Sequence, residues 1–226
     1  MNEEGQDAII RMFHVHKRYG GKSALKDLTL DICNNEFVFV TGRSGAGKTT
    51  LLRLLYMGEP VSEGQILVDG LNLSRISSQR IPLLRRKIGI IFQDYKLIPT
   101  KTVFDNVALV LEAAGRKASL IPKKVRSVLR MVGMDDRMDS LPQSLSGGEQ
   151  QRVAVARAAV GDPRIILADE PTGSLDEESA GVIMDFLETL HTRGATVVVA
   201  THDKELLQRN NLRIVNLRDG RLWPAQ

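Results

Sequence analysis

Cysteine is nearly absent from this 226-residue sequence: Cys33 is the only one, so no disulfide can form within the chain. Disulfide-stapled secreted scaffolds are therefore excluded, and a reducing compartment is the expected location. No apolar run approaches the roughly 18 residues that a membrane-spanning helix needs. The N-terminal MNEEGQDAII has neither a basic segment nor an apolar core, so no signal peptide is predicted. These absences favour a cytoplasmic protein.

Charge of one sign is in only slight excess, because 31 Lys and Arg stand against 27 Asp and Glu, a net charge of +4. The distribution is uneven, since residues 75–130 contain 13 Lys and Arg and only three acids. Such a segment can face nucleic acid or an anionic membrane, and it can equally be a solvated face. We favour a membrane-apposed face, with Lys123, Lys124 and Arg126 as its test positions.

Strand and helix patterns alternate along the chain, as is typical of an α/β fold. Before residue 34, two segments with a period of two predict antiparallel strands joined at the turn GGKS. Continuous apolar strands of the kind buried in a parallel sheet follow in EFVFVTG, KIGIIFQ, RIILADE and ATVVVATHD. Between residues 95 and 160 the pattern becomes helical. We therefore expect one domain over 1–226, in which a helical lobe over 95–160 is inserted into an α/β core.

A phosphate-binding loop is predicted at GRSGAGKT, residues 42–49, which fits the pattern G-x-x-x-x-G-K-[ST] between an apolar strand and a helical segment. The glycines let backbone N–H groups surround a phosphate, and the helix start adds a positive dipole end. Lys48 can reach the β and γ phosphates, and the Thr49 hydroxyl can bind Mg²⁺. The predicted nucleotide-binding residues here are Gly42, Ser44, Gly45, Ala46, Gly47, Lys48, Thr49 and Thr50.

Two carboxylates close the buried strand RIILADE. An acidic pair at such a position is costly unless metal or water chemistry uses it. Asp169 is suited to hold Mg²⁺ through water. Glu170 is suited to orient and deprotonate the water that attacks a γ-phosphate.

A second anion-binding helix start is predicted in LSGGEQQRVAVARA. Ser146 and Glu149 have the spacing of a capping box, which starts a helix at Gly147. Capping alone accounts for these two residues, but it does not account for Gly147 and Gly148, because glycine is a poor helix former. Close approach of a ligand explains them, so Ser146, Gly147, Gly148 and Glu149 are predicted binding residues.

Taken together, these motifs resemble those of the nucleotide-binding subunits of ABC (ATP-binding cassette) proteins, over nearly the whole chain. GRSGAGKT is similar to the Walker A motif, IILADE to Walker B and LSGGEQ to the family signature. Tyr19 matches the aromatic residue that stacks on adenine, Gln93 the Q-loop glutamine, SLD up to Asp176 the D-loop, and His202 the switch histidine. The implied fold is α/β: a P-loop NTPase core of ABC type, RecA-like over 1–94 and 161–226, with an N-terminal antiparallel β region and an inserted helical subdomain over 95–160.

The resemblance implies an ATPase that uses ATP and Mg²⁺. Catalytic roles fall to Glu170, His202, Gln93 and Lys48, and metal binding to Thr49, Gln93 and Asp169. Two copies of such a chain pack head to tail, and the signature of one closes over the γ-phosphate held by the Walker A motif of the other. A homodimer that ATP strengthens is therefore expected.

The segment around the Q-loop, IPLLRRKIGIIFQDYKLIPTKTVFDNVAL, is most similar to cassettes of a bacterial cell-division complex. That resemblance implies a separate membrane subunit, a peripheral location on the cytoplasmic face of the inner membrane, and activation of cell-wall hydrolases. The alternative is a cassette of a lipoprotein-releasing or macrolide-export transporter. Cassettes acting on DNA or ribosomes usually carry large insertions or a second cassette, so no nucleic-acid partner is expected. One departure is EPVSEGQI, which is one residue longer than the usual turn at that place.

Overall fold

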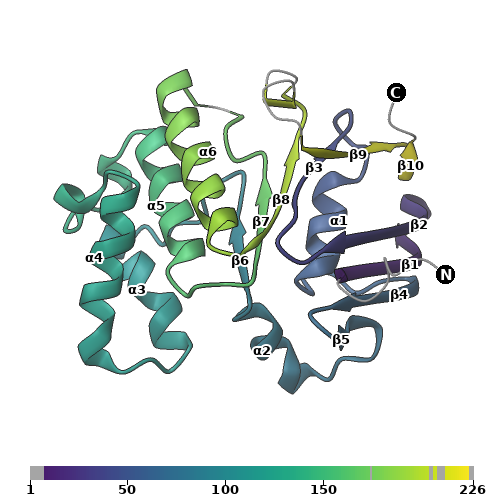
Figure 1. Ribbon diagram of the computed structural model, residues 1–226, viewed down its shortest axis with the longest axis horizontal. Helices are drawn as coiled ribbons and strands as arrows, with labels where there is room; N and C mark the ends of the chain where they lie inside the picture. The colour runs from purple at the N-terminus through teal and green to yellow at the C-terminus, as the bar shows by residue number, and fades with distance from the viewer. Residues whose placement is uncertain (1–7, 174, 204–205, 208–211, 224–226) are drawn as a thin grey trace. The chain divides into compact units, whose positions relative to one another are not determined.

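The computed structural model describes residues 8–173, 175–203, 206–207 and 212–223 (Figure 1). The chain divides into two compact units, one of residues 1–85 and 196–226 and one of residues 86–195. Both units combine strands with helices, as the sequence predicts for an α/β protein. The helices predicted over 95–160 lie within the second unit, which extends beyond them at both ends; the lobe as a separate insertion stays a prediction.

The first unit begins with an antiparallel sheet in the order β2-β1-β4-β5. Its strands are β1 (Ala8–Tyr19), β2 (Lys22–Cys33), β4 (Glu63–Val68) and β5 (Leu71–Asn72). The predicted alternation is confirmed in β2, where Leu28, Leu30 and Ile32 are buried while the residues between them are exposed. In β1 the pairing with β2 shifts register at several points, so its alternation is interrupted by bulges.

Four further strands of the first unit follow the order β10-β9-β3-β8. They are β3 (Phe37–Thr41), β8 (Thr196–Thr201), β9 (Arg213–Arg218) and β10 (Arg221–Trp223). The central strand β3 is parallel to both β8 and β9, and its residues 37–40 are all buried, which explains why its sequence is a continuous apolar run. The predicted hairpin turn is confirmed at Asp219 and Gly220, which have φ angles of 52° and 79°.

Helices α1 (Lys48–Leu55) and α2 (Ile81–Arg85) also belong to the described part of the first unit. Helix α1 contacts β2 and β8 and buries Leu51, Leu52, Leu54 and Leu55, so it is fixed to the strands by its apolar face. Short 3₁₀ turns cover Leu73–Arg75 and Ser78–Arg80.

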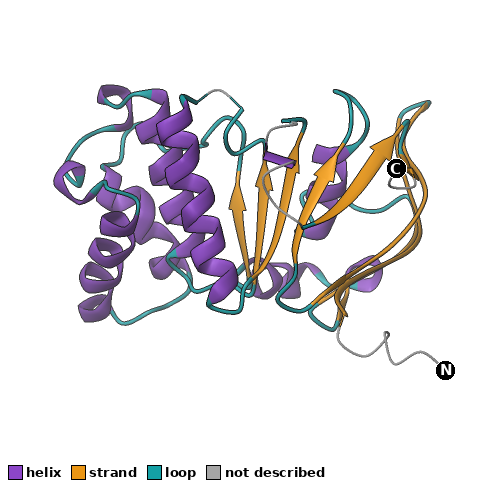
Figure 2. Ribbon diagram, turned by 45° about the horizontal axis from the view of Figure 1, so that its top comes forward, coloured by secondary structure: helices purple, strands orange, loops and turns teal. Residues whose placement is uncertain are grey.

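The second unit places helices beside a parallel pair of strands, β6 (Ile88–Ile91) and β7 (Ile165–Asp169) (Figure 2). Its helices are α3 (Val103–Ala113), α4 (Ile121–Met131), α5 (Gly147–Ala159) and α6 (Glu177–Thr192). Short 3₁₀ turns cover Ala118–Leu120, Asp135–Arg137 and Pro142–Ser144. Helix α5 contacts α3, α4, α6 and β6, so the small Ala and Val side chains of this helix form the centre of the unit. Within the described ranges, no helix has both the length and the hydrophobicity needed to cross a bilayer.

Candidate functional site

The phosphate loop lies between the end of β3 and the start of α1, as predicted. Gly42, with a φ of 152°, passes so close to β9 that an added Cβ would lie 2.3 Å from the main-chain oxygen of Leu217. At Gly47, with a φ of 109°, a Cβ would lie 2.7 Å from Leu25 Cδ2 and 2.8 Å from the Ala24 oxygen. Both positions therefore require glycine, because only a residue without a side chain fits this path.

Lys48 is the first residue of α1 and is almost fully buried, and its Nζ donates a hydrogen bond of 2.8 Å to the Gly42 oxygen. The helix has no side-chain cap and no acid in its first turn, so its amino end keeps a positive dipole. Among the other predicted loop residues, Ala46 is buried, Gly42, Gly47 and Thr50 are half-buried, and Ser44, Gly45 and Thr49 are exposed. The loop thus offers main-chain N–H groups, an ammonium and a hydroxyl to an anion.

Two more predicted residues belong to the first unit. His202 directly follows β8, and the parallel register pairs Thr41 of β3 with Thr201 of β8. The phosphate loop and His202 therefore leave neighbouring strand ends, where a parallel sheet presents its ligand-binding residues. Tyr19 is the last residue of β1, and 40% of its surface is exposed.

The predicted acids and Gln93 belong to the second unit, also at strand ends. Ile91 of β6 pairs with Ala168 of β7 in parallel register. Gln93 and Asp169 therefore come just after two residues that lie side by side. Gln93 is exposed, whereas Asp169 and Glu170 are half-buried. Glu170 has a φ of 47°, in the left-handed region that non-glycine residues rarely adopt. Such backbone strain is found where a side chain must point in a particular direction.

The capping box predicted at the start of α5 is confirmed. Ser146 Oγ accepts a hydrogen bond of 3.2 Å from the Glu149 N–H, and Glu149 Oε2 accepts one of 2.8 Å from the Ser146 N–H. The bond from the Ser146 N–H is the main cause that lowers the pKa of Glu149 below its ordinary value of 4.5. Glu149 is therefore ionised at neutral pH, and its charge stabilises the amino end of the helix.

Removal of the capping carboxylate should destabilise the protein in a pH-dependent manner. We expect Glu149→Gln to lower the free energy of unfolding by about 1 kcal/mol at pH 7. Because the folded-state pKa is lowered, this contribution is present above the unfolded value and is lost as the pH falls through the folded value. Urea unfolding at pH 7 and pH 3 measures it, with Glu112→Gln, an exposed position on α3, as the control. An equal loss at both pH values would contradict the ionic cap.

Gly148 at the start of α5 has a packing cause of its own, besides the predicted ligand. A Cβ at Gly148 would lie 2.7 Å from Ser179 Oγ and 3.2 Å from Ser179 Cβ, in the first turn of α6. A Cβ at Gly147 would lie 3.0 Å from the Tyr95 hydroxyl. Packing within the chain is therefore sufficient to exclude a side chain at Gly148, and the ligand at this helix start stays a prediction. The double glycine therefore does not by itself indicate a ligand.

The D-loop match falls partly outside the described residues, because Ser174 of SLD is not among them. Asp176 caps the start of α6, and its Oδ1 accepts a hydrogen bond of 2.8 Å from the Ser179 N–H. This bond lowers the pKa of Asp176 below its ordinary value. Since Ser179 also contacts Gly148, the amino ends of α5 and α6 lie together in the second unit.

Sequence reasoning missed two polar residues of α5, the buried Gln151 and the half-buried Arg157. Gln151, 1% exposed, donates a hydrogen bond of 2.8 Å to the oxygen of Pro171, which follows Glu170. Arg157 donates hydrogen bonds of 2.6 Å each to the oxygens of Tyr95 and Lys96, just beyond Gln93. Burial lowers the pKa of the Arg157 guanidinium. The available signal was a Gln and an Arg among the Ala and Val residues of this predicted helix.

The predicted residues thus form two sets, one in each unit. The first unit holds Tyr19, the phosphate loop and His202, and the second holds Gln93, the two acids and the capped start of α5. In the described part of the chain, no three His, Cys, Asp or Glu side chains cluster as a metal site. An Asp and a Thr hydroxyl are nonetheless the oxygen ligands that Mg²⁺ uses when substrate phosphates and waters supply the others. Each set therefore includes an oxygen ligand of the kind that suits Mg²⁺, Thr49 in the first unit and Asp169 in the second.

The basic segment 75–130 does not form one continuous element, since it is divided between the two units. Several of its charges are engaged locally: Lys124 forms an ion pair with Asp162, and Arg85 Nη2 donates a hydrogen bond of 2.8 Å to the Met57 oxygen. Lys123 and Arg126 are exposed on α4. The membrane-apposed face stays a prediction, and Lys124 contributes less to it than its charge suggested.

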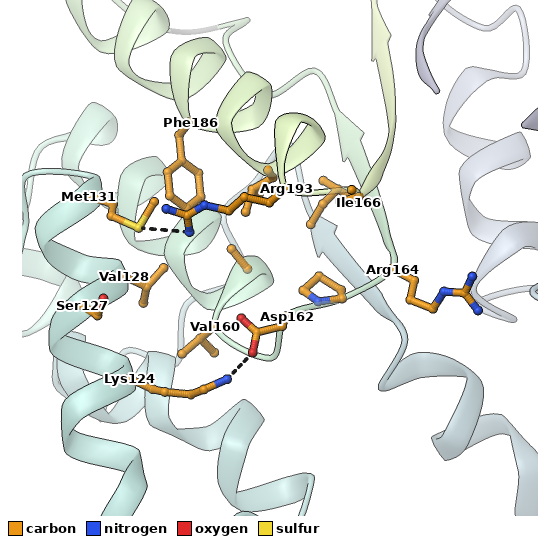
Figure 3. Close-up of a pocket in the computed structure, with 15 residues that line it drawn as sticks. Lys124, Ser127, Val128, Met131, Val160, Asp162, Arg164, Ile166, Phe186 and Arg193 are labelled. Atoms are coloured by element: carbon orange, nitrogen blue, oxygen red, sulfur yellow. Dashed lines mark hydrogen bonds and ion pairs between the residues drawn. The ribbon is translucent and has the colours of Figure 1, made fainter. Parts of the chain in front are cut away.

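A cavity of about 360 Å³ lies in the second unit between α4, the end of α5 and the end of α6 (Figure 3). Its wall is apolar at Val128, Val160 and Phe186, and the Lys124–Asp162 ion pair lies at its edge. None of the predicted nucleotide-site residues lines it. The cavity is therefore distinct from both sets of motif residues.

Comparison with known proteins agrees with this arrangement. The sequence profile of the family described as ABC transporter matches residues 25–173. The chain is 45% identical to the cell division ATP-binding protein FtsE of Bacillus subtilis, over 94% of this chain and 93% of the relative. Identity to FtsE of Escherichia coli is also 45%, over 95% and 97% of the two chains. A dimeric ATP-binding cassette, MJ0796, solved in a post-hydrolysis state with ADP and Pi, superposes with a TM-score of 0.89 at 35% identity, covering 96% of this chain and 97% of that one. The predicted cassette fold is thereby confirmed.

Proposed function

Because this chain belongs to the ABC transporter family, we propose that it is the ATP-binding and ATP-hydrolysing subunit of a cell-division complex of the FtsE type. The observation that carries the proposal is 45% identity over nearly the full length of FtsE proteins from two distant bacteria. The Q-loop segment that the sequence analysis singled out supports the same assignment.

Nucleotide binding is assigned to the first unit. Tyr19 stacks on the adenine, and the N–H groups from Gly42 to Thr50 surround the phosphates. When nucleotide binds, Lys48 Nζ donates to the β and γ phosphates in place of the Gly42 oxygen. The buried position of the ammonium supports this role, because a charge held in a protein interior interacts strongly with a nearby anion.

Hydrolysis is assigned to residues at the strand ends. Glu170 accepts the proton of the attacking water, and the Gln93 amide and the His202 imidazole orient that water and the γ-phosphate. Asp169, Thr49 and Gln93 would hold Mg²⁺, which neutralises phosphate charge when it is bound. Gln151 fixes the main chain at Pro171 and so supports the unusual backbone conformation of Glu170.

The start of α5 completes the site of a second copy of the chain. Ser146, Gly147, Gly148 and Glu149 of one copy face the γ-phosphate bound by the other, so each head-to-tail dimer has two composite sites. The dimeric cassette of similar fold supports this assembly. The dipole of a 13-residue capped helix favours an anion at this end.

The partner is assigned as an FtsX-like membrane subunit on the cytoplasmic face of the inner membrane. ATP binding and hydrolysis would move this subunit to activate cell-wall hydrolases during division. Exposed Lys123 and Arg126 support contact with an anionic surface. No nucleic-acid partner is expected.

Co-purification from membranes tests the partner. We expect a Glu170→Gln chain loaded with ATP and Mg²⁺ to recover a four-helix FtsX-like protein, because the unhydrolysed nucleotide holds the complex together. Wild-type chain loaded with ADP is the control and should recover less. Recovery of a lipoprotein-releasing or macrolide-export complex instead would contradict the assignment.

A further inference from the structure

Lys17 is a buried lysine close to the aromatic residue assigned to adenine. It lies on β1 two residues before Tyr19 and is only 6% exposed. Its Nζ donates hydrogen bonds to Glu59 Oε2 at 3.1 Å and to the Pro60 oxygen at 2.8 Å. The same ammonium lies over the Tyr19 ring, 4.7 Å from the ring centroid. A cation at this distance from an aromatic face is attracted by the ring quadrupole.

The segment that holds Lys17 is the unusually long turn EPVSEGQI. The turn is fixed to β1 at further points: the Ser62 N–H donates a hydrogen bond of 3.0 Å to the His16 oxygen, and the Arg18 N–H donates one of 3.0 Å to Ser62 Oγ. Arg18 also forms an ion pair of 3.0 Å with Glu63. The oxygens of Glu59 and Pro60 are therefore held in place, and the ammonium is fixed independently of Tyr19.

We propose that Lys17 is a positioning residue for Tyr19. The turn at Glu59 and Pro60 holds the Lys17 ammonium against one face of the Tyr19 ring, and the other face of the ring stacks on a purine base. This inference rests on the proposed role of Tyr19 in nucleotide binding. The ammonium restricts the orientation of a ring that is 40% exposed. It also draws π-electron density towards itself, which reduces the repulsion between the ring and an electron-rich base on the opposite face.

The proposal distinguishes the base from the phosphates, because Lys17 acts only through Tyr19. We expect Lys17→Met to weaken ATP binding by between about 2-fold and 30-fold, the range that corresponds to one cation–π contact. Binding of inorganic triphosphate, which has no base to stack, should not change. In turnover assays the variant should raise KM for ATP and leave kcat unchanged.

The experiment is isothermal titration of the full chain with Mg·ATP and, separately, with inorganic triphosphate. Tyr19→Leu should weaken ATP binding more than Lys17→Met, and the double variant should be no weaker than Tyr19→Leu alone, since both remove one stacking unit. Lys17→Arg should restore part of the affinity, because arginine is also a cation. Arg18→Gln is the matched control: it removes the neighbouring ion pair with Glu63 and should bind ATP as the wild type does.

Two results would overturn the inference. One is an unchanged ATP affinity in Lys17→Met while Tyr19→Leu binds weakly; the other is an equal loss of ATP and triphosphate affinity, which would mean that Lys17 only supports the fold. If Lys17→Met does not fold, Glu59→Gln decides in its place, with a smaller loss of ATP affinity and the same triphosphate affinity expected. No effect of Tyr19→Leu would instead reject the assigned role of Tyr19, and the inference with it, while leaving the hydrolytic residues untouched.

Discussion

Glu170→Gln is expected to reduce steady-state ATP hydrolysis by about 100-fold or more, the typical contribution of a general base. Glutamine keeps the size of the side chain but cannot accept the proton of the attacking water. The left-handed backbone at Glu170 is retained, because it is set by the main chain after β7 and by the bond from Gln151 to Pro171. ATP affinity should therefore stay close to that of the wild type, since the phosphate loop belongs to the first unit.

The same variant should accumulate as a dimer with ATP and Mg²⁺. Bound ATP persists without hydrolysis, so the α5 start of each copy stays on the γ-phosphate of the other. Solution scattering measures the mass with and without nucleotide, and phosphate release measures turnover. Glu112→Gln, on the exposed side of α3, is the control and should hydrolyse ATP like the wild type. A Glu170→Gln chain that remains monomeric with ATP, or that turns over at the wild-type rate, would reject the composite site.

Gly42→Ala should weaken nucleotide binding. The added Cβ would lie 2.3 Å from the Leu217 oxygen, and this atom belongs to the main chain of β9, which is paired with β3 and cannot move alone. The φ of 152° is also unfavourable for alanine. Overpacking of this kind typically costs about 1–3 kcal/mol. If the phosphate loop changes its conformation while the pairing of β3 with β9 is kept, we expect the Kd for ATP to rise by at least about 10-fold.

Titration with Mg·ATP and thermal unfolding together measure this effect. Gly21→Ala is the matched control, because a Cβ there would meet no atom within 4 Å and its φ is ordinary. It should change neither ATP affinity nor Tm appreciably. Wild-type ATP affinity in Gly42→Ala would show that the loop does not need its close approach to Leu217.

Local sequence was sufficient for the elements and motifs whose signals lie within a few residues. The phosphate loop, the capping box of Ser146 and Glu149 and the turn at Asp219 and Gly220 depend on neighbours along the chain, and each was found where it was predicted. The parallel strands were predicted from their continuous apolar runs. Because the carboxyl ends of parallel strands share one edge, the strand order also accounts for the grouping of His202 with the phosphate loop and of Gln93 with Asp169.

Why a position requires a particular residue type was less predictable where the cause is a contact with a distant segment of the chain. The sequence predicts a ligand at Gly148, and only the structure shows that Ser179 of α6 also excludes a side chain there. Lys17 alternates with buried Val15 along β1, so its burial was readable from the pattern, but a lysine is ordinarily assigned to solvent. Its acceptors are more than forty residues away, in a turn whose sequence is unusual only in its length.

By itself the sequence determined the family, the cassette fold and the residues of the nucleotide motifs, since each motif needs particular residue types at fixed short spacings. Only the tertiary structure decided how Lys17, Gln151 and Arg157 support those motifs. Lys17 and Gln151 are buried and Arg157 is half-buried, so their polar groups need acceptors within the protein. Which main-chain oxygens they reach depends on how distant segments pack.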